Sequence, residues 1–330
     1  MTPIEVPFWA WATLALVVTV SVFIDLFAHR GDHVDSRKRA LAWTIGWVVV
    51  SLLFNVYVAI YFGLEAGEQF LAAYLLEKSL SVDNLFVFLL IFSMLRIPRT
   101  EQRRVLTWGI AGAIVTRGAL IFAGAAAVKQ WHEVLYLFGA LLVIAAVKLL
   151  HEPEEEQENR TLVWLSRHLP WSKTLDGHKF FTRKNGRLLG TPLLLALIAI
   201  ELTDVVFAID SVPAAFAVTT EPFIIYSSNL LAILGLRALY IVLAGVLAEL
   251  KYLRFGLAAV LAFAGMKLLL SKWIHVPPLV SVGVIASCIT IAVVASVRAR
   301  SRERVVAAAA AATAESVADA DDDDQNAARS

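Results

Sequence analysis

Two short stretches of the chain carry the same pattern of acidic and small polar residues inside long apolar runs. Each has an acid, five residues, a second acid and a small polar residue: Glu77, Asp83 and Asn84 in the first, and Asp204, Asp210 and Ser211 in the second. Carboxylate, amide and hydroxyl oxygens are the ligands that hard cations such as Mn²⁺, Mg²⁺ and Ca²⁺ prefer. A charge in the centre of a membrane helix costs at least about 2.5 kcal/mol, so such residues mark a functional site by default. The pattern therefore predicts a site that handles a hard divalent cation.

Other charges lie in the same kind of apolar run and need partners, because buried charges are usually paired. They are the acids Asp25 and Glu201 and the bases Lys78, Arg117 and Arg237. We predict two structural ion pairs, Glu77 with Arg117 and Asp204 with Arg237. We also predict that Lys78 pairs with a neighbouring acid. Three carboxylates then remain for a cation: Asp83, Asp210 and either Asp25 or Glu201, with Asn84 and Ser211 adding neutral oxygens. Asp25 is also open to interpretation as an interfacial acid.

Pro213 lies three residues after the second acid of the second stretch. Proline has no backbone N–H, so the carbonyl of Ile209 loses its helical partner. An acid beside such a carbonyl in a broken helix is a recurring cation site. The freed carbonyl of Ile209 is therefore a candidate oxygen ligand beside Asp210, although many membrane prolines merely kink a helix.

The elements that hold these residues are membrane helices. The chain has 330 residues, of which 59% are hydrophobic and 17% charged, and its net charge of +1 gives no indication of a nucleic-acid partner. A span needs about 20 mostly apolar residues. Nine segments qualify: residues 8–28, 41–62, 70–95, 106–128, 134–149, 189–218, 223–247, 253–270 and 279–297. We predict an all-α bundle of about nine spans, whose partner is the lipid bilayer.

Basic residues orient this bundle. Alternate connections hold 22 Lys and Arg residues, whereas the other connections hold two. Basic loops stay in the cytoplasm, so the N-terminus is predicted outside and the C-terminus inside. The transmembrane domain is predicted over residues 1–304, with a cytoplasmic loop at about 151–188 that contains a short interfacial helix at 161–169. Residues 305–330, rich in alanine and aspartate, are predicted to be disordered.

The two acidic stretches belong to an internal repeat of three spans. Arg117 and Arg237 occupy matching positions in the spans that follow them, and Lys148 and Lys267 match in the spans after those. Three is an odd number, so spans 3–5 and 6–8 cross the membrane in opposite senses. Inverted repeats of this kind are typical of secondary transporters, which bind their substrate near the midplane between the repeats.

Residues 77–88 and 200–214, which contain the two acidic stretches, resemble the two signature stretches of the TerC/Alx family. The resemblance covers roughly residues 5–300. It implies a bacterial inner-membrane protein of the LysE-type transporter group, active in metal-ion homeostasis, with manganese export as the leading assignment and an association with tellurium resistance. It also implies the ion-handling residues Glu77, Asp83, Asn84, Glu201, Asp204 and Asp210.

We therefore expect a gradient-driven exporter of a hard divalent cation, with protons as a candidate counter-ion and no tightly bound cofactor. The chain has no P-loop, and it shows none of the serine–histidine or H-E-x-x-H patterns of a hydrolase. We expect no enzyme activity. The alternative is a membrane scaffold that assembles with other membrane proteins and transports nothing, for which the long basic cytoplasmic loop is the support.

Overall fold

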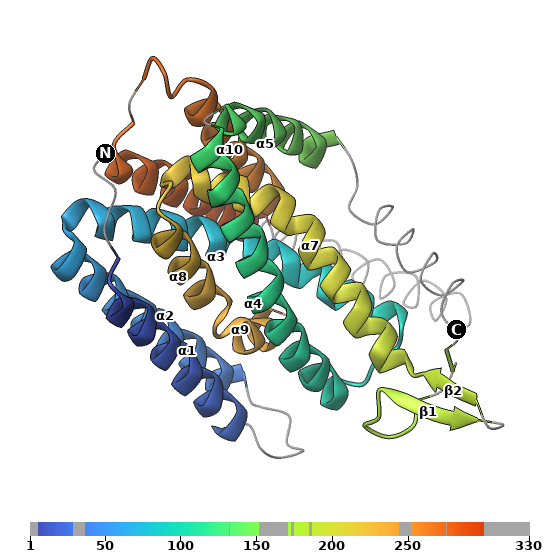
Figure 1. The fold of residues 1–330 in the computed structure, drawn as a ribbon. Helices are drawn as coiled ribbons and strands as arrows, with labels where there is room; N and C mark the ends of the chain where they lie inside the picture. The colour runs from blue at the N-terminus through green and yellow to red at the C-terminus, as the bar shows by residue number, and fades with distance from the viewer. Residues whose placement is uncertain are drawn as a thin grey trace, which may run out of the picture.

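The structure is a computed structural model that describes residues 6–28, 37–131, 133–151, 171–172, 175–184, 187–243, 252–274 and 276–299. Most of these residues are helical, which confirms the all-α membrane bundle (Figure 1). The helices are α1 (Phe8–Ala28), α2 (Arg37–Phe62), α3 (Leu64–Met94), α4 (Arg99–Gln130), α5 (Val134–His151), α7 (Pro192–Val218), α8 (Pro222–Ile233), α9 (Leu236–Leu243) and α10 (Leu253–Leu269), followed by a C-terminal helix, Pro278–Ala299. The predicted tail and the predicted helix at 161–169 lie outside the described residues.

Helices form here because long apolar runs can satisfy every backbone group internally, as lipid requires. Each of the nine predicted segments coincides with a helix or a helix pair. In the described part of the chain, six helices are long and apolar enough to cross a membrane, or seven if α8 and α9 form one bent span. The other two are α3, which carries four acids and a lysine, and α10, which is 17 residues long. The number of spans and their sidedness stay predictions.

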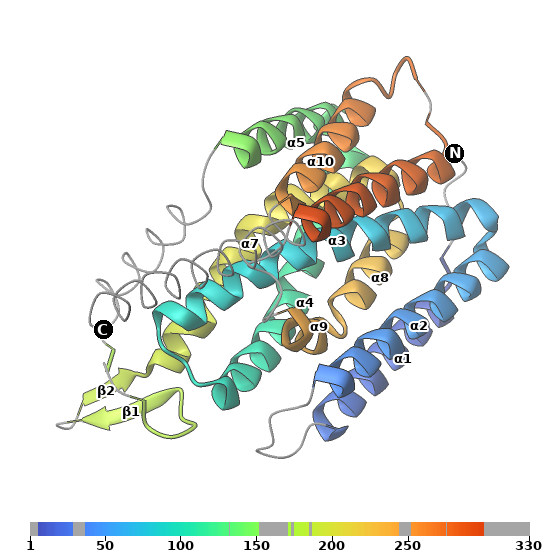
Figure 2. The ribbon, with the colours of Figure 1, turned by 180° about the vertical axis from the view of Figure 1, so that it is seen from behind.

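The helix contacts follow the internal repeat. α3 packs against α7 and α8, α4 packs against α7, and α5 packs against α10 (Figures 1 and 2). In the internal repeat, α3 corresponds to α7, α4 to the pair α8–α9, and α5 to α10. A two-fold axis that relates the repeats therefore converts the contact between α3 and α8 into the contact between α7 and α4. The contacts of α3 with α7 and of α5 with α10 map onto themselves. The packing therefore has the symmetry that the repeat predicts, and both acidic stretches lie at its centre.

The pairing of α5 with α10 depends on two glycines. A Cβ on Gly139 would lie 3.0 Å from the carbonyl oxygen of Gly265, and a Cβ on Gly265 would lie 2.8 Å from that of Gly139. Small residues let membrane helices approach at backbone distance, where van der Waals packing is strongest.

Pro213 does not interrupt the helix that carries Asp210. α7 runs without interruption from Pro192 to Val218, through Pro213. The helix break in this repeat lies between α8 and α9, which are bent by 41°. Gly235 adopts φ +80° there, and a Cβ on it would lie 2.5 Å from Cδ1 of Trp47. The left-handed backbone and the indole of α2 therefore both require glycine at the turn.

Part of the predicted cytoplasmic loop forms a β-hairpin that the sequence analysis did not predict. Strands β1 (Phe181–Lys184) and β2 (Arg187–Gly190) pair antiparallel and lead directly into α7 (Figure 1). Two contacts attach the segment before the hairpin to the start of α4. Nδ1 of His178 lies 2.6 Å from Oε1 of Glu101, and the guanidinium of Arg104 lies 5.5 Å from the ring centre of Phe180.

Candidate functional site

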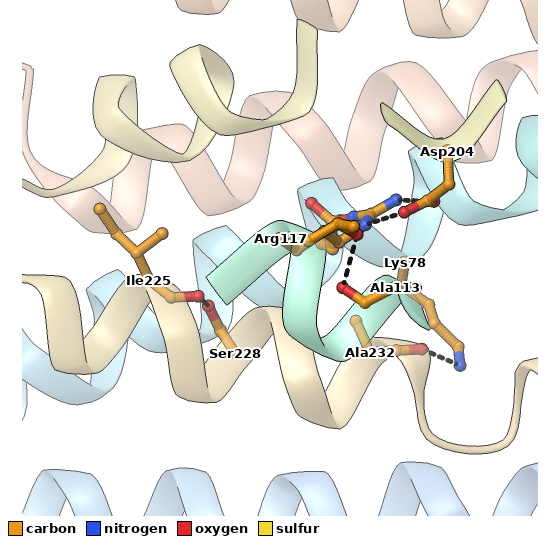
Figure 3. Close-up of polar contacts among 9 residues, drawn as sticks. Lys78, Ala113, Arg117, Asp204, Ile225, Ser228 and Ala232 are labelled. Atoms are coloured by element: carbon orange, nitrogen blue, oxygen red, sulfur yellow. Dashed lines mark hydrogen bonds and ion pairs between the residues drawn. The ribbon is translucent and has the colours of Figure 1, made fainter. Parts of the chain in front are cut away.

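Arg117 is the centre of the candidate site. Its side chain comes from α4, is 1% exposed, and reaches acids on both of the helices that carry the repeated stretches. Its Nε donates to Oδ2 of Asp204 at 3.1 Å and its Nη2 to Oδ1 at 2.8 Å (Figure 3). Its Nη1 forms an ion pair with Oε1 of Glu77. One guanidinium therefore joins α3, α4 and α7 at the interface between the repeats.

Asn84 supplies a further oxygen to this guanidinium. In the amide orientation that satisfies both of its ends, the oxygen accepts from Nη2 of Arg117 at 3.1 Å and the nitrogen donates to the carbonyl of Leu80 at 3.0 Å. Oε2 of Glu77 is buried and has no hydrogen-bond donor among the described residues. Two carboxylates, one amide oxygen and one arginine thus form a buried cluster of formal charge −1, which we call the Arg117 cage (Glu77, Asn84, Arg117, Asp204).

The predicted pairing of Asp204 with Arg237 is wrong, although Glu77 does contact Arg117. Nη2 of Arg237 lies 2.9 Å from Oδ1 of Asp25 in α1 and donates to the backbone oxygen of the same residue at 2.6 Å. Its Nη1 donates to Oγ1 of Thr107 at 3.3 Å. Two features of the packing explain the exchange. α4 packs on α7, which brings Arg117 to Asp204, and the bend at Gly235 sets Arg237 on α9, where it reaches α1.

Glu201 lies one turn before Asp204 on α7 and faces α4. A Cβ on Gly112 would overlap its carboxylate, so the missing side chain is what makes room for the acid. Gly109, one turn earlier on α4, extends this notch: a Cβ there would lie 3.9 Å from Oε1 of Glu201. The sequence analysis missed the notch, although two glycines three residues apart on one face of a charged span are a signal that could have found it.

Lys78 follows the first acid of the cage but turns away from it. Its Nζ donates to the carbonyl of Ala232 at 3.0 Å (Figure 3). Ala232 is one of the last residues of α8, where backbone carbonyls lose their helical donors. The lysine therefore caps α8 at its break, a role that differs from the predicted pairing with a neighbouring acid.

The remaining predicted ligands are not brought into the cage. Asp210 is half-buried on α7, where the positive charge of Lys148 in α5 is among the charges that act on it. Ser211 is buried, and its Oγ has no partner among the described residues. Asp83 belongs to α3, but its side chain lies outside the described part of the structure. Its predicted convergence with Asp210 therefore stays a prediction.

No group of three or more His, Cys, Asp or Glu residues is arranged to hold a metal ion among the described residues. What the described residues do form is an oxygen cage occupied by a guanidinium. The same oxygens are of the type that hard divalent cations prefer. Glu201, which Asp204 repels, lies next to the cage on the same helix.

The comparisons with known proteins agree with this helical membrane bundle. The family description "Integral membrane protein TerC family" matches residues 62–304, so this chain belongs to the TerC family. It is 47% identical over 290 residues to an uncharacterized membrane protein of Myxococcus xanthus, which covers 87% of this chain and 91% of that protein.

Two further relatives are similar over comparable lengths. A protein of Escherichia coli K12, provisionally named a membrane-bound redox modulator, Alx, is 47% identical over 288 residues, or 83% of this chain and 90% of that protein. A membrane protein of Rickettsia bellii is 34% identical over 292 residues, or 87% of this chain and 97% of that protein. No solved structure matches this chain.

Proposed function

We propose that this protein is a secondary transporter of the bacterial inner membrane that exports a hard divalent cation, with Mn²⁺ as the cargo we expect. The observation that carries the proposal is the Arg117 cage. It lies where the two repeats meet, which is where inverted-repeat transporters bind their substrate. Its ligands are all oxygens, as Mn²⁺ prefers. The proposal includes nine spans, an external N-terminus and a cytoplasmic C-terminus.

In this proposal the cation and the guanidinium of Arg117 compete for the same oxygens. With the cation absent, the arginine partly neutralises Glu77 and Asp204. A divalent cation that displaces the arginine neutralises both carboxylates. Glu201, three residues before Asp204 on α7, is the acid that takes Arg117 during this exchange, because both lie along the interface of α4 with α7. The arginine thus never has to remain unpaired, which would be costly in a buried site.

Two other functions remain for comparison. The name of the Escherichia coli relative suggests redox activity, but this chain has one cysteine, Cys288, and so cannot form a dithiol pair of its own. The second alternative function is that of a membrane scaffold that transports nothing. It does not need an ionic cluster at the centre of the bundle, where replacing buried ion pairs with apolar residues is often neutral or stabilising. The buried charges therefore favour transport.

The test is Mn²⁺ movement across vesicles that contain the purified protein at matched amounts. The variants Glu77→Gln and Asp204→Asn each leave Arg117 one carboxylate, so we expect them to insert and fold. Each removes one of few anionic ligands, so transport should fall at least tenfold. Glu65→Gln, which neutralises an exposed acid on the same helix α3, is the matched control. Transport by both cage variants at the wild-type rate would contradict the proposed site.

A wild-type protein that moves no Mn²⁺, Mg²⁺ or Ca²⁺ under a proton gradient of either direction would contradict the transport proposal itself. If the protein transports Mg²⁺ or Ca²⁺ but not Mn²⁺, the cage remains the proposed binding site and only the proposed cargo is wrong. A Glu201→Gln variant should bind Mn²⁺ but transport it slowly, because the displaced arginine has lost its second partner.

A further inference from the structure

The β-hairpin before α7 exposes an apolar face at the point where a membrane helix begins. Partners in an antiparallel pair lie on the same face, and residues two apart on one strand share that face too. The register pairs Phe181 with Gly190 and Arg183 with Leu188, so Phe181, Arg183 and Leu188 lie together. Phe181 is 53% exposed and Leu188 65%. The opposite face holds Thr182, which is 6% exposed, so the hairpin is anchored by its other side.

A hollow of about 140 Å³ lies between this face and the first turns of α7. Its lining is almost entirely apolar and includes Trp171 and Phe181 from the loop and Leu194, Leu195 and Ile198 from α7. Such a hollow would be poorly hydrated in water, because an apolar lining gives a water molecule no hydrogen-bond partner.

The hollow continues the lipid-facing surface of α7. Leu194 and Ile198 begin a stripe at helical spacing that goes on through Leu202, Val206 and Ile209, which are 40%, 54% and 51% exposed. Residues 192–218 qualify as a membrane span, so exposed apolar side chains along it face acyl chains. An acyl chain that lies along this stripe therefore reaches the hollow without leaving apolar surface.

Along the hairpin, apolar residues are followed by basic residues, in the same order in which the acyl chains of an anionic lipid are followed by its charged headgroup. The apolar end, with Phe181 and Gly190, adjoins α7, and Arg183 lies two residues farther along β1, about 7 Å at the rise of a strand. Arg183 is exposed on the same face as the hollow, and the sequence places Lys184 and Arg187 beside the turn. A basic group just beyond an apolar hollow is complementary to the phosphate of an anionic headgroup.

We propose that this hairpin and the start of α7 form a binding site for one anionic phospholipid of the bilayer. One acyl chain occupies the hollow under Phe181 and Leu188, and the phosphate contacts Arg183. The lipid would hold the hairpin at the membrane surface, next to the start of α4, to which His178 and Phe180 attach it. The proposal is independent of any transport activity.

The experiment uses the full chain in phosphatidylcholine vesicles that contain a trace of a lipid with a photoactivatable acyl chain, either phosphatidylglycerol or phosphatidylcholine. After illumination, mass spectrometry measures labelling of the peptide that carries Leu194 and Ile198. We expect several-fold more labelling by the phosphatidylglycerol probe. Labelling near Leu137 and Ile144, which are 58% and 62% exposed on the candidate span α5 and lie outside this stripe, should be equal for the two probes and shows that the protein is inserted.

Three variants sharpen the test. Arg183→Gln should lower phosphatidylglycerol labelling of the hollow about fivefold, which corresponds to one basic residue at an anionic surface. Lys179→Gln, which removes an exposed charge from the same loop, should leave it unchanged. Leu194→Trp fills the hollow with apolar atoms and should abolish labelling there by either probe. Equal labelling of the wild-type hollow by both probes, or an Arg183→Gln variant that labels like the wild type, would overturn the proposal.

Discussion

The strongest prediction concerns the removal of the arginine at the centre of the cage. Arg117→Gln keeps a polar but shorter, uncharged side chain and leaves the carboxylates of Glu77 and Asp204 close together without a cation. Breaking a buried ion pair by removing one partner costs about 3–5 kcal/mol. Arg117 is 1% exposed and contacts both acids, so the upper half of that range is expected. We therefore expect the thermal midpoint to fall by roughly 8–20 °C.

The assay is the loss of soluble, monodisperse protein on heating in detergent. Arg254→Gln is the matched control, because Arg254 is an exposed arginine whose guanidinium lies over the ring of Phe255, and its loss should cost at most about 1 kcal/mol. The triple variant Arg117→Gln, Glu77→Gln, Asp204→Asn should regain most of the lost stability, since no unpaired charge remains.

Added metal gives the same experiment a second arm. If the cage is the cation site, Mn²⁺ should occupy the space that the guanidinium vacates and stabilise Arg117→Gln more than the wild type. At about 100 times its Kd the ion would return about 2.7 kcal/mol. The reasoning is refuted if Arg117→Gln melts at the wild-type temperature, and the exchange of arginine for cation is refuted if Mn²⁺ stabilises both proteins equally.

Three further predictions test the fold and the orientation. Gly235→Ala should cost about 1–3 kcal/mol in thermal stability because of its positive φ, and more if Trp47 cannot move, whereas Gly46→Ala, with open space around it, should be neutral or stabilising. A cysteine at Glu65 should react with an impermeant reagent from outside and one at Asn159 should not; the reverse would contradict both the orientation and the inverted repeat. Truncation before Ala307 should leave insertion and Mn²⁺ transport intact, and loss of either would contradict the predicted disorder of the tail.

Much of the helical architecture could be predicted because it depends on local properties of the chain. Apolar length alone locates the helices, and each predicted segment coincides with one or a pair of them. The repeat could also be found, because matching charges recur in the same order. The bend at Gly235 could not, since a glycine within an apolar run is compatible with a continuous helix. Pro213, in contrast, lies inside α7 without interrupting it.

The partners of the buried charges were harder to predict because they depend on tertiary contacts. Sequence equivalence assigned each arginine to the acid of its own repeat. The packing of α4 against α7 instead brings Arg117 to Asp204, across the boundary between the repeats. Nothing in the spacing of residues within one span predicts which face of it meets a span from the other repeat. The β-hairpin was missed for a similar reason, since its strands are four residues long and mix basic with apolar residues.

The departure from symmetry at the two arginines bears on how such a protein could work. Helix packing follows the two-fold symmetry of the repeats, but the ion pairs do not. Arg117 forms ion pairs with Glu77 and Asp204, the matching acids of the two repeats. Its equivalent Arg237 pairs instead with Asp25 of α1, a helix outside the repeat. The backbone departs in the same place, because α4 is continuous where its counterpart is broken into α8 and α9. In inverted-repeat transporters, alternating access arises from the movement of one repeat against the other around a fixed site. The two repeats share the same helix contacts but differ in local conformation, since α4 is continuous and α8–α9 is broken. This is the kind of asymmetry that such a movement requires. An arginine held by acids from both repeats is then well placed to respond to it.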